Sequence, residues 1–226
     1  KVLEDCRGMK PIRHITLKSR QVGLSTLWIL YHLDATLFQQ GVISGIMAHE
    51  LDSLQHLASI VKFALSNMPF PVKMTEDNQK RISFAHNDST MLIDLEFRST
   101  PLHNLHISEW AFCENQRLWA TFGAVSKWAN VTGESTGNGM GNDFYSTWMD
   151  AKEGKNDYRY RFIPWFANSE YRLQLNGAPN ISRDTRETKY NLDPEQLNYR
   201  RQMTSRLKDA FFIEYPEDEL DCWGQS

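Results

Sequence analysis

The stretch Lys-Ser-Arg-Gln-Val-Gly-Leu-Ser-Thr, which begins at Lys18, constrains the fold of this chain more than any other. A phosphate-binding loop usually reads Gly, four residues, then Gly-Lys-Ser/Thr: backbone N–H groups surround the phosphates, the Lys reaches the outer ones and the hydroxyl binds Mg²⁺. Here Lys18 and Gly23 occupy the two Gly positions, Leu24 occupies the Lys position, and Ser25 and Thr26 supply hydroxyls. Taken alone, the stretch is equally typical of an ordinary turn into a helix.

The segments around this loop have the required order. Residues 12–17 form a β-leaning run that stops at the loop, and residues 24–40 are apolar on nearly all sides, as in a helix packed inside a layered fold. Gly41 is the expected C-terminal glycine of that helix. The sequence therefore predicts strand, loop and helix, which is the context of a phosphate-binding loop.

The rest of the chain alternates predicted strands and helices, which indicates a three-layer α/β domain with a mostly parallel sheet. We expect this core in residues 1–164 and a peripheral lobe or linker, with an acidic tail at 214–221, in residues 165–226. The expected strands are 42–47, 81–85, 90–97, 105–109, 128–132 and 158–164, and the expected helices are 50–65, 116–126, 144–152 and 194–207.

Composition excludes several classes of protein. The 226 residues carry a net charge of -3, so the chain is not a strongly basic nucleic-acid coat. Its three cysteines lie far apart, which predicts neither a disulfide framework nor a zinc site and favours a reducing compartment. No apolar run approaches the ~20 residues that span a bilayer, so we expect no membrane partner.

Two further segments carry candidate site residues. Glu109 ends a predicted buried strand, at the edge where ligands bind in open α/β sheets, and is a candidate for activating water. Its alternative role is to start the next helix near the helix dipole. Ser108 stands where an Asp would hold Mg²⁺, which a hydroxyl does more weakly. Residues 132–139, small and hydroxylated and then glycine-rich, suit a segment that senses phosphate, or an ordinary polar loop.

With these segments in sequence, residues 12–220 resemble the large subunit of viral DNA-packaging terminases. The stretch from Lys18 is similar to the family's deviant Walker A loop, in which some members carry the lysine at the start. Residues 105–112 resemble Walker B with the catalytic Glu, and residues 134–139 resemble the coupling motif. Residues 164–166 and 214–216 are similar to weaker landmarks.

The resemblance implies a RecA-like P-loop NTPase of the additional-strand, catalytic-Glu type that binds ATP and Mg²⁺ and hydrolyses ATP. It implies that Lys18 binds phosphate, Glu109 activates water, and Ser135 and Thr136 couple hydrolysis to DNA movement. Arg20 is a second cation candidate. The implied metal residues are Ser25, Ser108 and Glu109, and the implied nucleotide loop is Lys18, Ser19, Arg20, Gln21, Val22, Gly23, Leu24, Ser25 and Thr26.

The resemblance also implies partners: double-stranded DNA, a portal protein, a small terminase subunit and further copies in a ring on a procapsid in the host cytoplasm. The family's nuclease domain would begin where this chain stops, so we expect an ATPase without DNA cleavage. Arg98, before the Walker B strand, is a candidate arginine finger for a neighbouring subunit, or else a surface ion pair. The densest basic group, on the helix 194–207 and just beyond, contains Arg200, Arg201, Arg206 and Lys208, and a solvated helix face explains it better than DNA contact.

Two other functions remain open. One is a helicase-type or repair ATPase of the same broad fold. The other is a nucleotide-binding assembly module that has lost hydrolysis, for which Leu24 and Ser108 are the evidence.

Overall fold

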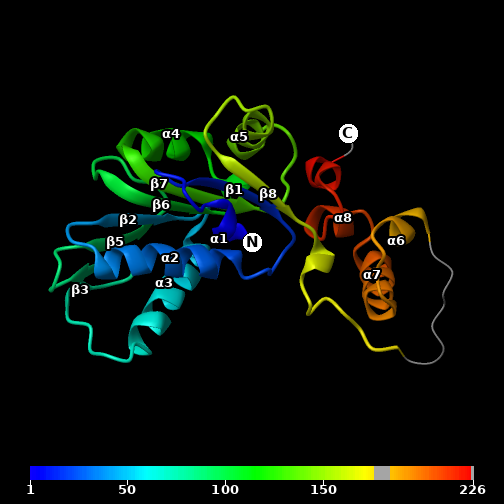
Figure 1. Cartoon of the computed structure of the whole chain (residues 1–226), viewed down its shortest axis with the longest axis horizontal. Coiled ribbons are helices and arrows are strands. Elements are labelled where there is room, and N and C mark those ends of the chain that lie inside the picture. Colours follow the sequence, from blue (N-terminus) through cyan, green and yellow to red (C-terminus); the bar gives the residue numbers. More distant parts are fainter. Residues whose placement is uncertain (176–183, 225–226) are drawn as a thin grey trace. The chain divides into compact units, whose positions relative to one another are not determined.

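The computed structural model describes residues 1–175 and 184–224. Within them, eight strands form one sheet in the order β3-β4-β5-β2-β6-β7-β1-β8 (Figure 1). β2 pairs in parallel with β5 and β6, and β6 with β7, whereas β3, β4 and β5 are antiparallel neighbours. The strands are β1 Arg13–Lys18, β2 Ile43–Met47, β3 Met74–Asp77, β4 Arg81–Phe84, β5 Thr90–Asp94, β6 Leu102–Ser108, β7 Val125–Ser135 and β8 Arg159–Ile163.

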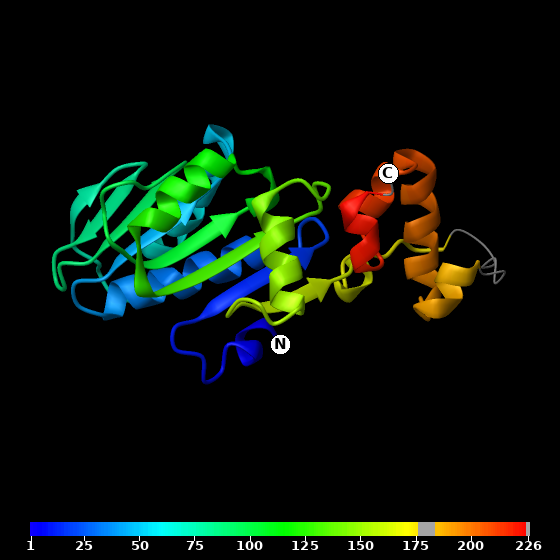
Figure 2. The same ribbon diagram turned by 90° about the horizontal axis from the view of Figure 1, so that it is seen from above.

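Helices cover both faces of this sheet. α2 and α3 lie on one face, and α4 and α5 lie on the other (Figures 1 and 2). This arrangement confirms the predicted three-layer α/β fold with a mostly parallel sheet. No described helix has the length and apolar character to cross a bilayer. The helices are α1 Val2–Asp5, α2 Leu24–Phe38, α3 Leu51–Ser66, α4 Asn115–Ala124, α5 Asp143–Lys152, α6 Thr185–Lys189, α7 Pro194–Leu207 and α8 Ala210–Glu214, with short 3-10 turns at Trp110–Phe112, Trp165–Ala167 and Glu219–Trp223.

Local sequence explains most of these elements. β2 is mostly apolar because strands flank it on both sides and Ile46 packs against α2 and α3, while its buried Ser44 is hydrogen-bonded to Thr36 of α2. α7 begins at Pro194 because Asp193 caps it, with Gln196 completing the reciprocal pair of hydrogen bonds. β3 was not predicted, because it lies at the edge of the sheet and three of its four residues are exposed.

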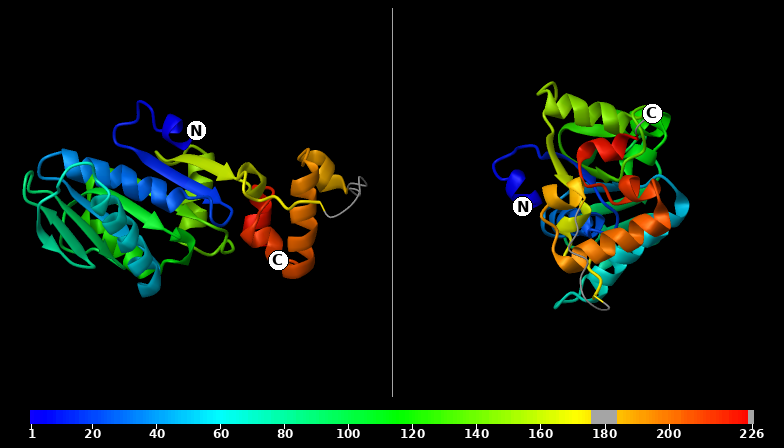
Figure 3. Two further views of the ribbon diagram at one scale, coloured as in Figure 1. Left: turned by 90° about the horizontal axis from the view of Figure 1, so that it is seen from below. Right: turned by 90° about the vertical axis from the view of Figure 1, so that its right-hand side faces the viewer.

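The chain divides into two compact units that do not follow chain order. The first contains residues 1–16, 23–135 and 140–161; the second contains 17–22, 136–139 and residues from 162 onward. The second unit has its own apolar cluster around Trp165 and Phe211, and its helices, drawn in orange and red, can be followed in Figure 3.

The expected acidic tail at 214–221 is wrong. Glu214 ends α8, and Asp218 caps the 3-10 turn Glu219–Trp223 through its side chain. Glu217 is buried, with 2% of its surface exposed. These carboxylates are therefore structural parts of the second unit. Residues 176–183 and 225–226 of the predicted lobe lie outside the described part of the chain.

Candidate nucleotide site

The start of α2 presents unsatisfied amide groups beside open space. Its first helical hydrogen bond runs from Leu27 N to Gly23 O, 3.1 Å, so the N–H groups of Leu24, Ser25 and Thr26 have no partner within the helix. No side chain caps this end in the described structure. Gly23 has a φ of 71°, and a Cβ placed on it would meet nothing within 4 Å. Such a helix start binds anions readily, because the amide dipoles also point there.

Residues from two neighbouring strands meet the first turn of α2. Ser108 ends β6 and stands in register with Glu134 on β7. Ser108 Oγ donates a hydrogen bond of 2.9 Å to Glu134 Oε1, and Ser25 Oγ donates one of 2.7 Å to the same oxygen. The structure thus brings two of the predicted metal residues to one fully buried carboxylate. Sequence reasoning placed Glu134 in the coupling motif and gave it no role, although a charged residue among the buried positions of a strand was a signal.

Glu109 lies immediately beyond β6 and meets the coupling motif. Its backbone is left-handed, with φ 51° and ψ 50°, which is uncommon for a residue with a side chain. Ser135 Oγ donates a 3.4 Å hydrogen bond to Glu109 Oε2 and accepts one of 3.2 Å from Ala111 N. The predicted water-activating acid and a predicted coupling residue are therefore in direct contact.

Trp110 anchors the turn that carries Glu109. The indole is 1% exposed, and its Nε1 donates a 2.9 Å hydrogen bond to Asp143 Oδ2. Burial raises the pKa of the Asp143 carboxyl, while the indole hydrogen bond opposes that rise. A Cβ on Gly133 would lie 2.3 Å from Cε3 of the indole, so Gly133 is the residue that lets Trp110 pack onto β7.

The first half of the predicted loop belongs to the second unit. Ser19 N donates to Ile163 O and Arg20 N to Glu214 O, both at 3.0 Å. The Arg20 guanidinium forms an ion pair with Glu214, 3.1 Å from Nε to Oε2. These two amides and this cation are engaged by protein groups, so the amides at the start of α2 are the ones suited to phosphate. Lys18, at the end of β1, is buried, as is Ser19.

The rest of the predicted loop and of the coupling motif divides between the units. Gln21 and Val22 lie in the second unit, and Thr136 lies there with the turn 136–139. In that turn, a Cβ on Gly137 would come within 2.0 Å of Cys222 O, so only glycine allows the turn to pack on the 3-10 segment. The chain passes from the first unit to the second between Ser135 and Thr136.

Arg98 lies on the segment between β5 and β6 and is exposed. Both hydrogen bonds that the structure gives its guanidinium go to Glu96, at 3.0 and 3.2 Å. This is the surface ion pair that the sequence offered as the alternative to an arginine finger.

The basic group on and just beyond α7 is only in part a solvated helix face: Arg206 and Lys208 are exposed, but Arg200 and Arg201 are held by carboxylates. Arg200 is 5% exposed, and its Nε donates a 2.6 Å hydrogen bond to the buried Glu217. Arg201 donates two hydrogen bonds, 2.9 and 2.8 Å, to Glu187. That arrangement holds the pKa of the Glu187 carboxyl below its usual value, chiefly through the Arg201 hydrogen bond. Carboxylates from neighbouring segments thus neutralise both arginines.

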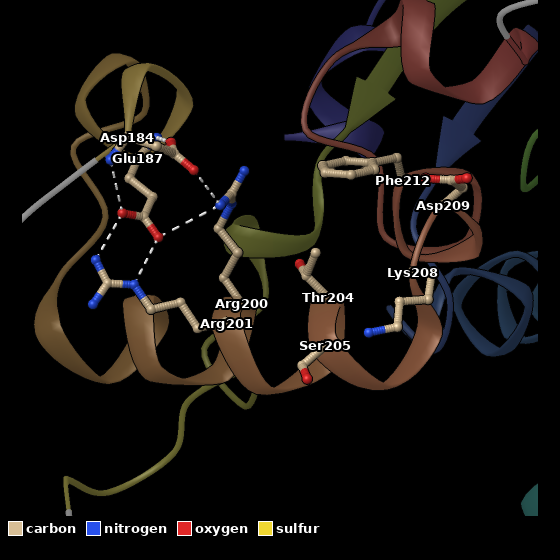
Figure 4. Close-up of a pocket in the computed structure, with 9 residues that line it drawn as sticks. All are labelled: Asp184, Glu187, Arg200, Arg201, Thr204, Ser205, Lys208, Asp209 and Phe212. Carbon is tan, nitrogen blue, oxygen red and sulfur yellow. Dashed lines mark hydrogen bonds and ion pairs between the residues drawn. The ribbon is translucent and has the colours of Figure 1, made fainter.

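These side chains line a pocket of about 570 Å³ within the second unit (Figure 4). Figure 4 shows Arg200 and Arg201 turned toward Asp184 and Glu187. The charges on its walls are largely paired with one another. The lining residues are Asp184, Glu187, Arg200, Arg201, Thr204, Ser205, Lys208, Asp209 and Phe212.

The donor set at Glu134 fits Mg²⁺ with a phosphate ligand. Mg²⁺ prefers oxygen ligands and is usually held by one or two carboxylates together with substrate phosphates and water. Ser25, Ser108 and Glu134 provide two hydroxyls and one carboxylate beside a helix start suited to phosphate. Among the described residues, no cluster of three or more His, Cys, Asp and Glu side chains forms a protein-only metal site.

The sequence matches no protein-family model and no curated protein. The fold is similar to solved structures. The large terminase of a thermophilic bacteriophage, solved in complex with ATP-γ-S, has a TM-score of 0.64 and 14% identity, over 99% of this chain and 51% of that one. The ATPase domain of the Thermus phage P74-26 large terminase has a TM-score of 0.64 and 11% identity, over 96% and 92%. The bacteriophage HK97 large terminase has a TM-score of 0.66 and 11% identity, over 96% and 48%.

The chain thus spans about half the length of the ATP-γ-S-bound terminase and of the HK97 protein, and nearly all of the isolated P74-26 ATPase domain. At identities of 11 to 14% the likeness is one of fold. The chain has the RecA-like P-loop fold of the ATPase domains of large terminases.

Proposed function

We propose that this chain is the ATPase motor domain of a viral large terminase, which hydrolyses ATP to move double-stranded DNA into a procapsid. The observation that carries the proposal is the convergence of Ser25, Ser108 and Glu134 at the carboxyl edge of β6 and β7, beside Glu109. Ligands bind at this edge in open α/β sheets. The fold shared with terminase ATPase domains supports the same conclusion.

The residues of the predicted loop and Glu109 have separate roles in this proposal. The amides of Leu24, Ser25 and Thr26 bind phosphate, Lys18 supplies the cation, and Glu109 orients and deprotonates the attacking water. Gly23 leaves room for the ligand, while Ser19, Arg20, Gln21 and Val22 shape the loop. Mg²⁺, when bound, neutralises charge on the phosphate oxygens.

The Glu109–Ser135 contact supports a route from hydrolysis to movement. Ser135 senses the state of Glu109, and the next residue, Thr136, belongs to the second unit. A change at Glu109 would therefore reach the turn 136–139, which belongs to the second unit, across one peptide bond. We propose residues 1–164 as the ATPase core and residues 165–226 as the lobe that responds.

The proposed partners are double-stranded DNA, a portal protein, a small terminase subunit and other copies of this chain in a ring, acting in the host cytoplasm. The thermophilic-bacteriophage large terminase that was solved with ATP-γ-S has also been solved with ADP, which supports ATP as the nucleotide. The paired arginines on α7 make Arg200 and Arg201 poor candidates for DNA contact.

A hydrolysis-deficient assembly module is the competing function, and one observation favours it: residues 24 and 108 lack the usual lysine and aspartate. The test is ATP turnover by wild type, Lys18→Ala and Glu109→Gln, measured alone and on procapsids with DNA. We expect DNA-stimulated turnover in wild type that both substitutions abolish, with nucleotide binding retained in Glu109→Gln. If the chain binds nucleotide but shows no turnover in any assembled state, the assembly module is favoured. If it separates DNA strands in the absence of procapsids, a helicase is favoured.

A further inference from the structure

Glu134 occupies an unusual place for a carboxylate. It is fully buried, one residue before the end of β7, at the ligand edge of the sheet. Burial of a carboxylate costs free energy unless other groups compensate it. Here two hydroxyls donate to one oxygen: Ser25 of the predicted nucleotide loop and Ser108, the last residue of β6 and the neighbour of Glu109.

Strand register explains how Glu134 reaches this point. Ser108 and Glu134 are opposite each other on parallel strands, so their side chains leave the same face of the sheet, toward α2. Ser108 has a hydroxyl and no carboxylate to present there. The Glu134 side chain is long enough to cross the space between the strands and lies 2.9 Å from Ser108 Oγ.

Buried polar side chains on β6, β7 and α2 lie next to Glu134. His106 Nε2 lies 3.9 Å from Glu134 Oε1, and His106 Nδ1 shares a 3.0 Å hydrogen bond with Thr132 Oγ1. His32 of α2 contacts the same hydroxyl through Nε2 at 2.8 Å. This line of side chains ties α2 to β6 and β7 directly behind Glu134, and it limits how far the carboxylate can shift.

We propose that Glu134 supplies the carboxylate of the magnesium site, in place of the aspartate that Ser108 replaces. Ser25 and Ser108 orient it, and Glu109 stays available to activate water. The inference rests on the proposed ATPase function and deepens it. It explains how the chain could hydrolyse ATP with Ser108 in the usual aspartate position, because the neighbouring strand β7 supplies the carboxylate for the metal.

The test measures metal affinity separately from turnover. Binding of Mn²⁺ to the full chain with ATP-γ-S is followed by electron paramagnetic resonance, and ATP-γ-S affinity is measured with Mg²⁺ and with EDTA. For Glu134→Gln we expect Mn²⁺ affinity to fall about tenfold or more, with affinity for ATP-γ-S in EDTA unchanged. Wild-type Mn²⁺ affinity in this variant would overturn the proposal.

A second experiment moves the carboxylate from β7 to β6. Ser108→Asp combined with Glu134→Gln returns an acid to the usual strand, and we expect it to recover most of the lost Mn²⁺ affinity. Failure of this double variant to exceed Glu134→Gln would assign Glu134 a purely structural role. Asp94→Asn is the matched control: Asp94 ends β5 at the same edge but pairs with Lys80 at 3.0 Å, and its loss should leave Mn²⁺ affinity unchanged.

Glu134→Asp covers the possibility that the glutamine variant does not fold. It keeps the charge but shortens the side chain by one methylene, so Mn²⁺ affinity should fall while affinity for ATP-γ-S in EDTA remains that of the wild type. Equal Mn²⁺ affinity in Glu134→Asp and wild type would count against the proposal. If the proposed ATPase function is wrong, the wild-type protein itself will show no Mg²⁺-dependent binding of ATP-γ-S, and this result differs from a wrong assignment of Glu134.

Discussion

Ser135 Oγ contacts Glu109 Oε2 at 3.4 Å, and the same hydroxyl oxygen accepts a hydrogen bond from Ala111 N. The last residue of β7 therefore contacts the candidate catalytic acid, which lies just beyond β6, through one hydroxyl. Ser135 is followed directly by the turn 136–139, which belongs to the second unit.

Ser135→Ala should lower kcat for ATP about tenfold, because Glu109 loses the hydroxyl that orients it. Affinity for ATP-γ-S should not change, since Ser135 is not among the proposed phosphate ligands. Steady-state turnover and equilibrium binding check this. Ser126→Ala, at the start of the same strand, is the control and should match wild type. Equal turnover in both variants would mean that Ser135 does not position Glu109.

Gly133→Ala should destabilise the first unit by roughly 1–3 kcal/mol, because its methyl group overlaps the Trp110 ring and must displace it. Turnover should fall with it, since Trp110 anchors Glu109. Denaturant unfolding measures the loss. Gly123→Ala in α4 is the control: a Cβ there meets nothing within 4 Å, and alanine favours the helix, so stability should hold or rise.

Acid should destabilise the fold through buried histidines. Burial, aided by His106, lowers the pKa of His32 to about 3, and burial lowers that of His14 to about 4 although Asp5 raises it. Both are neutral when folded, so their contribution is complete above the unfolded pKa of about 6.5 and is lost as pH falls below it. As pH falls below 6.5, each histidine lowers the free energy of unfolding by up to about 1.4 kcal/mol per pH unit, until its pKa in the folded protein is reached.

Denaturant unfolding at pH 7, 6 and 5 measures this slope. His32→Gln keeps a hydrogen-bonding group near Thr132 but cannot take up a proton, so the free energy of unfolding of this variant should fall less steeply between pH 6.5 and 4. A wild-type slope in this variant would assign the acid sensitivity to other groups.

Arg200→Ala should destabilise the second unit by about 1.5–3 kcal/mol, because it removes two hydrogen bonds to the buried Glu217, which keeps only its ion pair with Arg186 and a long hydrogen bond from Trp165. Chemical denaturation followed by circular dichroism provides the measurement. Arg206→Ala on the same helix is exposed and should change stability by less than about 0.5 kcal/mol. Similar effects of the two substitutions would show that the ion cluster is not a stabilising element.

Arg98→Ala should leave turnover by isolated subunits unchanged and lower turnover in the assembled ring, if Arg98 leaves Glu96 to reach a neighbour's nucleotide. Turnover on procapsids, compared with Arg81→Ala as a surface control, tests this. Full activity of assembled Arg98→Ala would remove the trans role and leave the Glu96 ion pair as its explanation.

The sequence by itself determined the layered α/β fold and the position of the loop before α2, because these follow from local periodicity, capping and turn residues. It also made Glu109 a candidate for activating water, since an acid after a buried strand is a local signal. The tertiary structure decided what local patterns do not encode. The register of β6 and β7 placed Glu134 beside Ser108, and packing drew Arg200 and Arg201 of α7 into an ion cluster with carboxylates from neighbouring segments. Both depend on contacts between residues far apart in the chain, so no single stretch of sequence contains them.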